Sequence, residues 1–267
     1  DTMMNITLPP LIFISMTADT TWDQLRAGII SPLIALLLVL ILMLAAIILG
    51  RLIPMTAQRL RTFSVLCAMP NTSFIAFPVI LSVLGQEGLT YAVLYDVGMT
   101  VAFCSIAIFA LQGGMGQKES WRSLINPSLV ATVCGLVINR MGVSLPELLL
   151  APLRIMGNAT VPIAMLLMGY MLGGLKFQSA AISIELGAVC ICKLLIYPLL
   201  AYLLIKPFDL DPLLRMVIIM QAAMPSMAST PVLVEKYGGD GEFAATAVFV
   251  TTLLSVVTIP FVVHLLF

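Results

Sequence analysis

The sequence predicts an all-α polytopic membrane protein made of an inverted repeat of five spans plus five, with two crossed broken helices. Three observations predict this fold class: a very apolar composition, a series of landmarks that recurs once, and two proline-flanked interruptions of apolar segments. Hydrophobic residues make up 61% of the chain and charged residues only 10%, whereas about a quarter of a soluble domain is charged. Acidic and basic residues are equal in number and form no blocks, so a lipid bilayer is the expected partner and nucleic acid is not.

Nine apolar segments can be recognised, because a bilayer-spanning helix needs about 20 mostly apolar residues. They cover residues 3–18, 28–53, 61–85, 88–112, 127–143, 150–174, 180–205, 212–237 and 241–267. Turn-forming stretches separate them, such as GQEG at 85–88 and YGGDG at 237–241. The five cysteines lie in apolar segments without metal-ligand spacing, so neither a metal site nor a cofactor is expected.

Several landmarks occur twice in the same order. NITLP at 5–9 returns as NATVP at 158–162, AMP at 68–70 returns at 223–225, and PVILSVLGQEG at 78–88 returns as PVLVEKYGGDG at 231–241. We therefore expect a first repeat over residues 1–112 and a second over 121–267. The helix at 127–143 has no counterpart within the chain, so a further helix is expected upstream of residue 1 in the parent protein.

Five spans per copy would place the second copy upside down in the membrane, as in many secondary transporters. Basic residues in the joints then set the orientation. Arg51, Arg59, Arg61, Lys118, Arg122, Lys176 and Lys236 fall on one side, and Arg26, Arg140, Arg154, Lys206 and Arg215 fall on the other. The larger group is expected in the cytoplasm, which puts the C-terminus outside a bacterial cytoplasmic membrane.

The two interruptions are flanked by Pro70 and Pro78 in the first copy and by Pro225 and Pro231 in the second. Non-helical backbone is tolerated at membrane depth only where protein or a watery cavity satisfies its polar groups, so the two breaks are expected to meet and cross near the bilayer midplane. Pro78 and Pro231 suit the first turn of a new half-helix, which Ser229 or Thr230 is able to cap. The alternative is a pair of ordinary proline kinks.

The polar residues at the breaks are the candidate substrate-binding residues. They are uncharged, so they can bind a carboxylate at the partly positive helix ends or offer oxygen atoms to a cation. The candidates are Asn71, Thr72, Ser73, Gln221, Ser226, Ser229 and Thr230. Asn5, Thr7, Asn158 and Thr160 recur in both copies and either line the groove facing the crossing or bond helix to helix.

Two charged residues lie inside apolar segments, where charges are functional candidates by default. Asp96 is about 12 Å into its helix at the 1.5 Å rise per residue of an α-helix, and Lys193 is similarly central in its own. Asp96 is predicted to couple transport to protons or cations, with Lys193 as a second coupling candidate. The alternative is a buried ion pair between them.

The stretches PNTSFIAFPVILSVLGQEGLTYAVLYDVG and AAMPSMASTPVLVEKYGGD resemble the auxin efflux carrier family, whose bacterial members include organic-acid and malonate permeases. The resemblance implies a scaffold part, about residues 3–18 and 127–174, and a transport part, about 28–112 and 180–267. It also implies an elevator-like cycle, a homodimer and a substrate contact at Asn71. Ser73, Ala76 and Ser226 depart from residues common in the family.

The predicted function is secondary active transport of a small organic anion, expected to be a carboxylate, coupled to H⁺ or Na⁺. A cation:proton antiporter with crossed broken helices is the main alternative, and a channel is a further one. An intramembrane protease is weighed because YD at 95–96 and GGD at 238–240 resemble a two-aspartate arrangement, but Asp240 is expected in a joint between helices. The protein is therefore not expected to be an enzyme.

Overall fold

The computed structural model describes residues 3–17, 20–112, 126–143, 145–174 and 183–266, and these residues are mainly helical. The elements up to residue 112 are η1 (Met3–Thr7), α1 (Leu8–Thr17), α2 (Trp22–Gly28), α3 (Ser31–Gly50), α4 (Ala57–Ala68), α5 (Ala76–Ala102), η2 (Phe103–Ala107) and α6 (Ile108–Gln112). Those from residue 126 onward are α7 (Pro127–Met141), α8 (Glu147–Asn158), α9 (Thr160–Gly174), α10 (Ile184–Ile191), η5 (Cys192–Ile196), α11 (Tyr197–Ile205), α12 (Pro212–Ala223), α13 (Thr230–Lys236) and α14 (Gly241–Leu266). The all-α prediction is confirmed.

Five helical stretches in the described part of the chain are long and apolar enough to cross a membrane. They are Trp22–Gly50, Ala76–Gln112, Glu147–Leu167, Ile184–Ile205 and Gly241–Leu265. Shorter apolar helices cover Asn5–Thr17, Pro127–Met141 and Pro212–Ala223. Two of the predicted segments, 61–85 and 212–237, are each divided by a non-helical stretch and for that reason do not count as continuous spans. The protein is an integral membrane protein.

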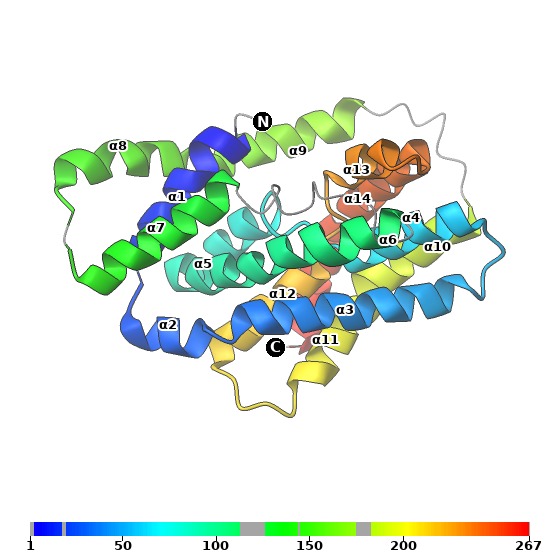
Figure 1. Cartoon of the computed structure of the whole chain (residues 1–267), viewed down its shortest axis with the longest axis horizontal. Coiled ribbons are helices and arrows are strands. Elements are labelled where there is room, and N and C mark those ends of the chain that lie inside the picture. Colours follow the sequence, from blue (N-terminus) through cyan, green and yellow to red (C-terminus); the bar gives the residue numbers. More distant parts are fainter. Residues whose placement is uncertain (1–2, 18–19, 113–125, 144, 175–182, 267) are drawn as a thin grey trace.

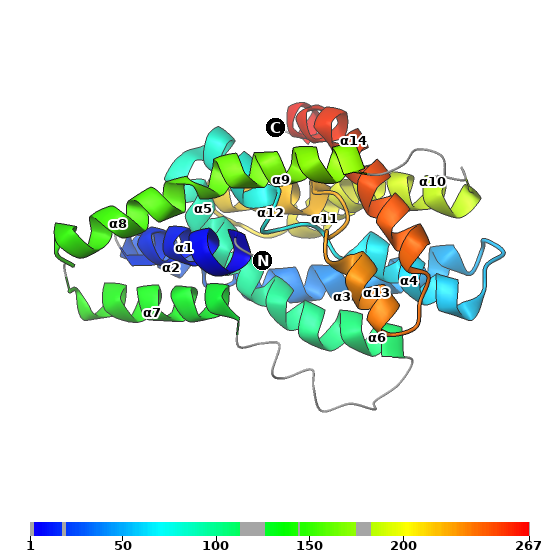
Figure 2. The same ribbon diagram turned by 90° about the horizontal axis from the view of Figure 1, so that it is seen from above.

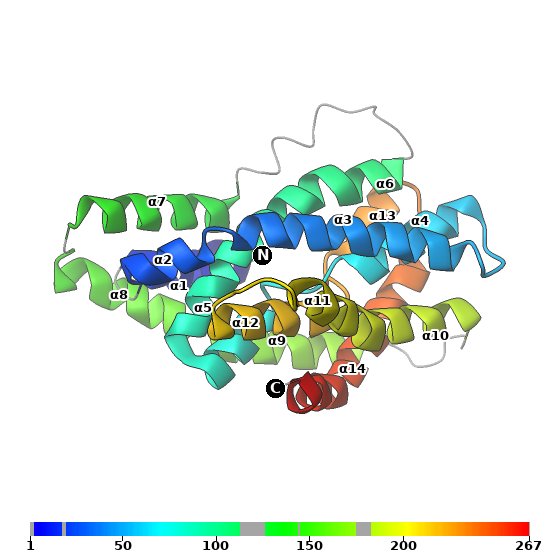
Figure 3. The same cartoon turned by 90° about the horizontal axis from the view of Figure 1, so that it is seen from below.

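The helices form two groups along the long axis of the molecule. α1 packs against α7 and α8 at one end, whereas α3, α4, α10, α13 and α14 lie toward the other, with α5 and α12 between the groups (Figures 1 and 2). Figure 3 shows the same separation from below, with α2 beside α7 and joined directly to α3. Of the helices expected to form the scaffold, α1, α7 and α8 lie together, whereas α9 extends from α8 toward α14 and contacts it. The division into fixed and moving parts stays a prediction.

α5 contains the end of the predicted segment 61–85 and the beginning of the predicted segment 88–112. It begins as the half-helix that follows the first break, bends at Gly85, where φ is 68° and ψ is −163°, and continues to Ala102. Positive φ is readily accessible only to glycine, which is why the predicted GQEG joint bends here. Farther along, a Cβ on Gly98 would lie 2.1 Å from the Pro32 carbonyl oxygen, so this glycine allows α3 to pack closely against α5.

Candidate functional site

The two breaks meet and pair through their backbones. α4 ends at Ala68 and α12 ends at Ala223, and the chain runs extended beyond both helix ends. The Asn71 N–H donates to the Pro225 carbonyl at 2.9 Å, and the Met227 N–H donates to the Met69 carbonyl at 3.0 Å, which makes Pro70 and Ser226 an antiparallel bridge. Each break therefore satisfies backbone groups of the other, as a bilayer requires. The predicted meeting of the two breaks is confirmed, and their position near the bilayer midplane stays a prediction.

The prolines begin and end the half-helices around this bridge. Pro78 lies in the first turn of α5 and Pro231 in the first turn of α13, as expected. Ser229 occupies the N-cap position of α13, but its side chain makes no capping hydrogen bond. The hydroxyls of Ser229 and Thr230 are both buried without a hydrogen-bond partner, so the expected capping is wrong.

Pro70 also leaves a carbonyl of α4 without its helical donor. The Leu66 carbonyl would accept a hydrogen bond from residue 70, but proline has no N–H. The Ser226 hydroxyl supplies the missing bond at 2.8 Å. In the other helix, the Ser226 N–H turns to the Thr251 hydroxyl at 3.3 Å instead of to Ala222. A side chain from outside α12 therefore has to satisfy the Ala222 carbonyl.

Lys193 takes that position. It is fully buried in η5, and its Nζ donates to the Ala222 carbonyl at 3.3 Å and lies 5.0 Å from the ring centroid of Tyr197. A cation at the C-terminal end of a helix complements the negative end of the helix dipole. The ion pair with Asp96, which was the alternative to a coupling role, does not occur among the salt bridges of the described residues.

Asp96 reaches the crossing from α5. Its Oδ1 accepts hydrogen bonds from the Thr72 hydroxyl at 2.5 Å and from the Ser73 hydroxyl at 3.0 Å. Both donors belong to the first break, only a few residues from the backbone bridge. The sequence identified Asp96 by its depth in an apolar segment, and Thr72 and Ser73 by their position between two prolines. The structure brings these three residues together.

A cavity of about 310 Å³ opens beside this group. Six of the predicted residues line it: Asn5, Pro70, Thr72, Ser73, Asp96 and Ser229. The sequence did not identify Met69, Met99, Thr100, Phe103, Asn126, Pro127, Ser128 and Met227, which complete the lining. Thr100 lies one helical turn after Asp96, and this spacing places both residues on one face of α5. The sequence alone could therefore have identified Thr100 as a neighbour of Asp96.

A smaller cavity of about 10 Å³ adjoins the same carboxylate. Asp96, Thr100 and Ser128 line both cavities, so the polar surface continues from α5 to the start of α7. Asn126 caps α7 by accepting a hydrogen bond from the Leu129 N–H at 2.7 Å. Among the described residues that line the two cavities, Asp96 is the one titratable side chain.

The remaining candidates for substrate binding do not line these cavities. Asn71 accepts a hydrogen bond from the Phe74 N–H at 3.1 Å, and Ser226 is held by Leu66 and Thr251. Gln221 is buried between α12 and α5, where its Nε2 lies 3.5 Å from the Ala92 carbonyl and its Oε1 has no partner. The crossing therefore turns some of its polar residues toward its own backbone and others toward the cavity.

The four groove candidates occupy different surroundings. Asn5 lines the larger cavity, and Thr7 is buried near it in η1. Asn158, the counterpart of Asn5, ends α8 with its side chain exposed, and Thr160 is buried with an unpartnered hydroxyl. The repeated motif thus contributes to the cavity from one copy only.

Asp240 lies in the turn before α14, where its Oδ1 accepts from the Phe243 N–H at 2.9 Å and its Oδ2 is 3.9 Å from the Arg59 guanidinium. It does not line a cavity with Asp96. Asp240 thus lies in a joint between helices, as the sequence predicts. Asp96 and Asp240 do not form the pair of carboxylates that a two-aspartate protease requires.

Comparison with known proteins reveals similarity along nearly the whole chain. A family model described as membrane transport protein matches residues 1–263. An uncharacterized transporter from Methanothermobacter thermautotrophicus is 28% identical over 262 residues, which cover 97% of this chain and 85% of the relative. An uncharacterized transporter from Methanocaldococcus jannaschii is 25% identical over 264 residues, 95% of this chain and 84% of the relative. A proposed malonate transporter from Rhizobium meliloti is 26% identical over 168 residues, 60% of this chain and 52% of the relative.

Proposed function

The chain belongs to the membrane transport protein family, the auxin efflux carrier type to which its paired motifs pointed, and on that premise we propose that it is a secondary active transporter of a small organic anion. A carboxylate is the proposed substrate and H⁺ the proposed coupling ion. The observation that carries the proposal is the contact of Asp96 with the Thr72 and Ser73 hydroxyls at the crossing.

The polar side chains that line the larger cavity support an anion site, because they offer uncharged hydrogen-bond donors. The unpartnered Ser229 hydroxyl and the side chains of Thr100, Ser128 and Asn5 share the larger cavity. α5 begins directly after the first break, and the partial positive charge at the N-terminal end of a helix favours an anion. Malonate is the first substrate to test, because one relative is named as a proposed malonate transporter.

An ionised Asp96 would oppose the binding of an anion in the same cavity. Two like charges about 4 Å apart repel each other by about 4 kcal/mol at an effective dielectric constant of about 20, which weakens binding by roughly a thousandfold. Protonation of Asp96 removes this repulsion. It also releases the Thr72 and Ser73 hydroxyls from the carboxylate, so that they become available to the substrate.

Proton and anion therefore bind together in the proposed mechanism, and neither binds well alone. This produces symport, because the carrier changes its access with both the proton and the anion bound or with neither bound. In the proposed cycle, the transport part slides past the scaffold like an elevator, and two scaffolds form a homodimer. The proposed location is a bacterial cytoplasmic membrane with the C-terminus outside.

A cation:proton antiporter is the second candidate, and one observation favours it. The Asp96 carboxylate and the Thr72 and Ser73 hydroxyls offer oxygen ligands of the type that Na⁺ prefers. Transport of Na⁺ against H⁺ without any organic anion would support this alternative and contradict anion symport.

Uptake of labelled malonate and other mono- and dicarboxylates into proteoliposomes tests the proposal. We expect uptake to increase as the external pH falls, because protonated Asp96 admits the anion, and to be independent of Na⁺. In Asp96→Asn, whose side chain is permanently neutral, we expect uptake to lose its pH dependence while anion exchange continues. Asp209→Asn, which changes an exposed acid between α11 and α12, is the matched control. Unchanged pH dependence in Asp96→Asn would contradict the proposed role.

A further inference from the structure

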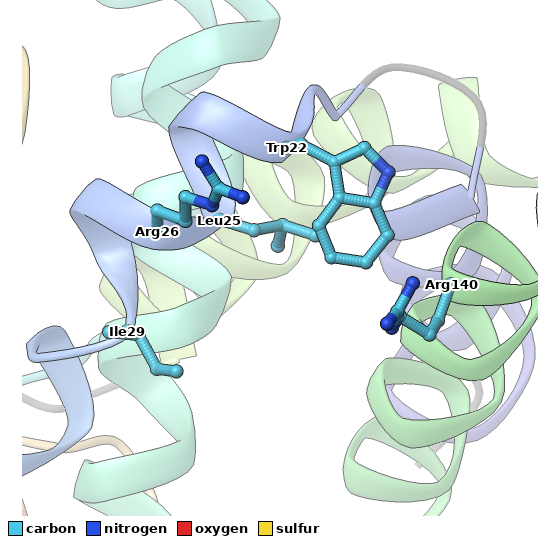
Figure 4. Close-up of a pocket in the computed structure, with 5 residues that line it drawn as sticks. All are labelled: Trp22, Leu25, Arg26, Ile29 and Arg140. Atoms are coloured by element: carbon cyan, nitrogen blue, oxygen red, sulfur yellow. The ribbon is translucent and has the colours of Figure 1, made fainter.

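A third cavity, of about 410 Å³, lies away from the crossing, where α2 approaches α7. Figure 4 shows the residues that line it, Trp22, Leu25, Arg26, Ile29 and Arg140, with the indole of Trp22 between the two arginines. None of these residues lines the cavities at Asp96. Proton-coupled transport at the crossing therefore leaves this third cavity unexplained.

The two arginines leave the cavity positively charged. The Arg140 guanidinium carbon lies 5.0 Å from the ring centroid of Trp22, an attractive cation–π contact that keeps its charge at the cavity wall. The salt bridges found in the described residues join Arg59 to Asp240 and Arg154 to Glu147, and neither involves Arg26 or Arg140. Two guanidinium groups that form no salt bridge within the described part of the chain favour a phosphate-type anion, which each can bind through two hydrogen bonds.

The cavity also has an apolar side that continues into the membrane. Trp22 is 44% exposed and Ile29 78% exposed, and the wall that they form leads directly to α3. Exposed apolar side chains then follow at helical spacing along this membrane-spanning helix: Leu33, Leu37, Leu40 and Leu44. An acyl chain fits against such a stripe, whereas a free soluble anion gains nothing from it.

We propose that this cavity binds an anionic phospholipid, with the headgroup against Arg26 and Arg140 and an acyl chain along α3. Tryptophan and arginine at the end of a membrane span occupy the depth of the headgroups, and basic pockets between spans suit anionic headgroups. Because Arg26 belongs to α2 and Arg140 to α7, the bound headgroup contacts both of these helices.

Fluorescence quenching by brominated lipids tests this site directly. The sequence contains two tryptophans, so Trp121→Phe leaves Trp22 as the single reporter. The protein is titrated in detergent with phosphatidylglycerol or phosphatidylcholine that carry identical brominated chains. We expect phosphatidylglycerol to reach half-maximal quenching at a concentration about tenfold lower, since each nearby basic residue adds appreciable attraction to an anionic lipid.

Arg26→Gln combined with Arg140→Gln is expected to remove this preference. Arg51→Gln combined with Lys206→Gln removes the same charge from exposed positions elsewhere and is expected to retain it. Equal quenching by both lipids in the parent protein, or an undiminished preference in the arginine variant, would overturn the proposal. Glycerol 3-phosphate at millimolar concentration is expected not to relieve the quenching. Relief at the concentration at which the lipid binds would identify a site for free phosphate esters and overturn the lipid assignment.

Discussion

The two arms of the crossing, residues 69–75 and 224–229, share a backbone arrangement but use their side chains differently. Both follow a helix that ends early, and they exchange one hydrogen bond in each direction. In the first arm, Thr72 and Ser73 turn outward to Asp96. In the second arm, Ser226 turns inward to the Leu66 carbonyl, and the Ser229 hydroxyl faces the cavity without a partner.

This difference separates structure from chemistry within a repeated motif. The features that match between the arms, the prolines and the paired backbones, hold the crossing together. The features that differ, a titratable partner on one arm and a free hydroxyl on the other, are suited to coupling and to substrate binding. Four substitutions test this division, beginning with the one expected to have the largest effect.

Ser226→Val is expected to abolish uptake and to destabilise the protein. It leaves the Leu66 carbonyl buried without a donor, and an unsatisfied buried polar group costs about 1–3 kcal/mol. Thermal unfolding in detergent and uptake in proteoliposomes measure the two effects. Ser82→Val is the control, since that exposed hydroxyl bonds only within its own helix, to Val79. A Ser226 variant as stable as the control would contradict a structural role for the second arm.

Ser229→Ala is expected to raise the KM for the anion about tenfold without moving the pH profile of uptake. It removes one neutral donor, and a hydrogen bond to a charged group contributes about 1.5 kcal/mol or more. Ser105→Ala removes an exposed hydroxyl bonded to Val101 and is the control. An unchanged KM would place the anion away from the second arm.

Thr72→Val is expected to move the pH of half-maximal uptake upward by about one unit. The Thr72 hydroxyl stabilises the ionised form of Asp96, so its loss lets the carboxyl group take up a proton at higher pH. Thr62→Val removes a hydroxyl that bonds within α4, to Gln58, and should leave the profile in place. A downward shift, or none, would contradict the coupling assigned to the first arm.

Lys193→Met is expected to have the smallest effect on pH dependence. The ammonium group satisfies the Ala222 carbonyl and lines neither cavity at Asp96, so its removal should change the unfolding temperature and leave the pH profile of uptake as it is. Uptake measured over a range of external pH tests this expectation. A displaced profile would restore Lys193 as a coupling group.

Features of the fold and of the site that depend on local sequence pattern could be predicted from the sequence. Proline position predicted both breaks, apolar length predicted the helices, and depth in an apolar segment identified Asp96. The directions of individual side chains could not be predicted, because they depend on which residues from distant parts of the sequence meet. Whether Ser226 faces the cavity depends on a Leu66 carbonyl that Pro70 leaves without a donor, and this requires knowledge of which residues meet.

The start of α7 illustrates the same limit. Asn126 and Ser128 reach the cavity from a helix that lies outside the repeated landmarks, so neither symmetry nor proline spacing marked them. The expected capping by Ser229 or Thr230 was wrong for a related reason. The backbone pairing of the two arms fixes the entry into α13 before a side-chain cap is needed.

The most direct test of the crossing as a proton-coupled anion site follows protons and anion in one preparation. Proteoliposomes containing a trapped pH-sensitive dye receive external malonate, or the carboxylate found to be transported, at equal pH on both sides. The parent protein is expected to acidify the interior as labelled anion enters, whereas Asp96→Asn should exchange labelled anion without acidification. Equal acidification by the parent protein and Asp96→Asn would contradict coupling through Asp96 and the two hydroxyls of the first arm.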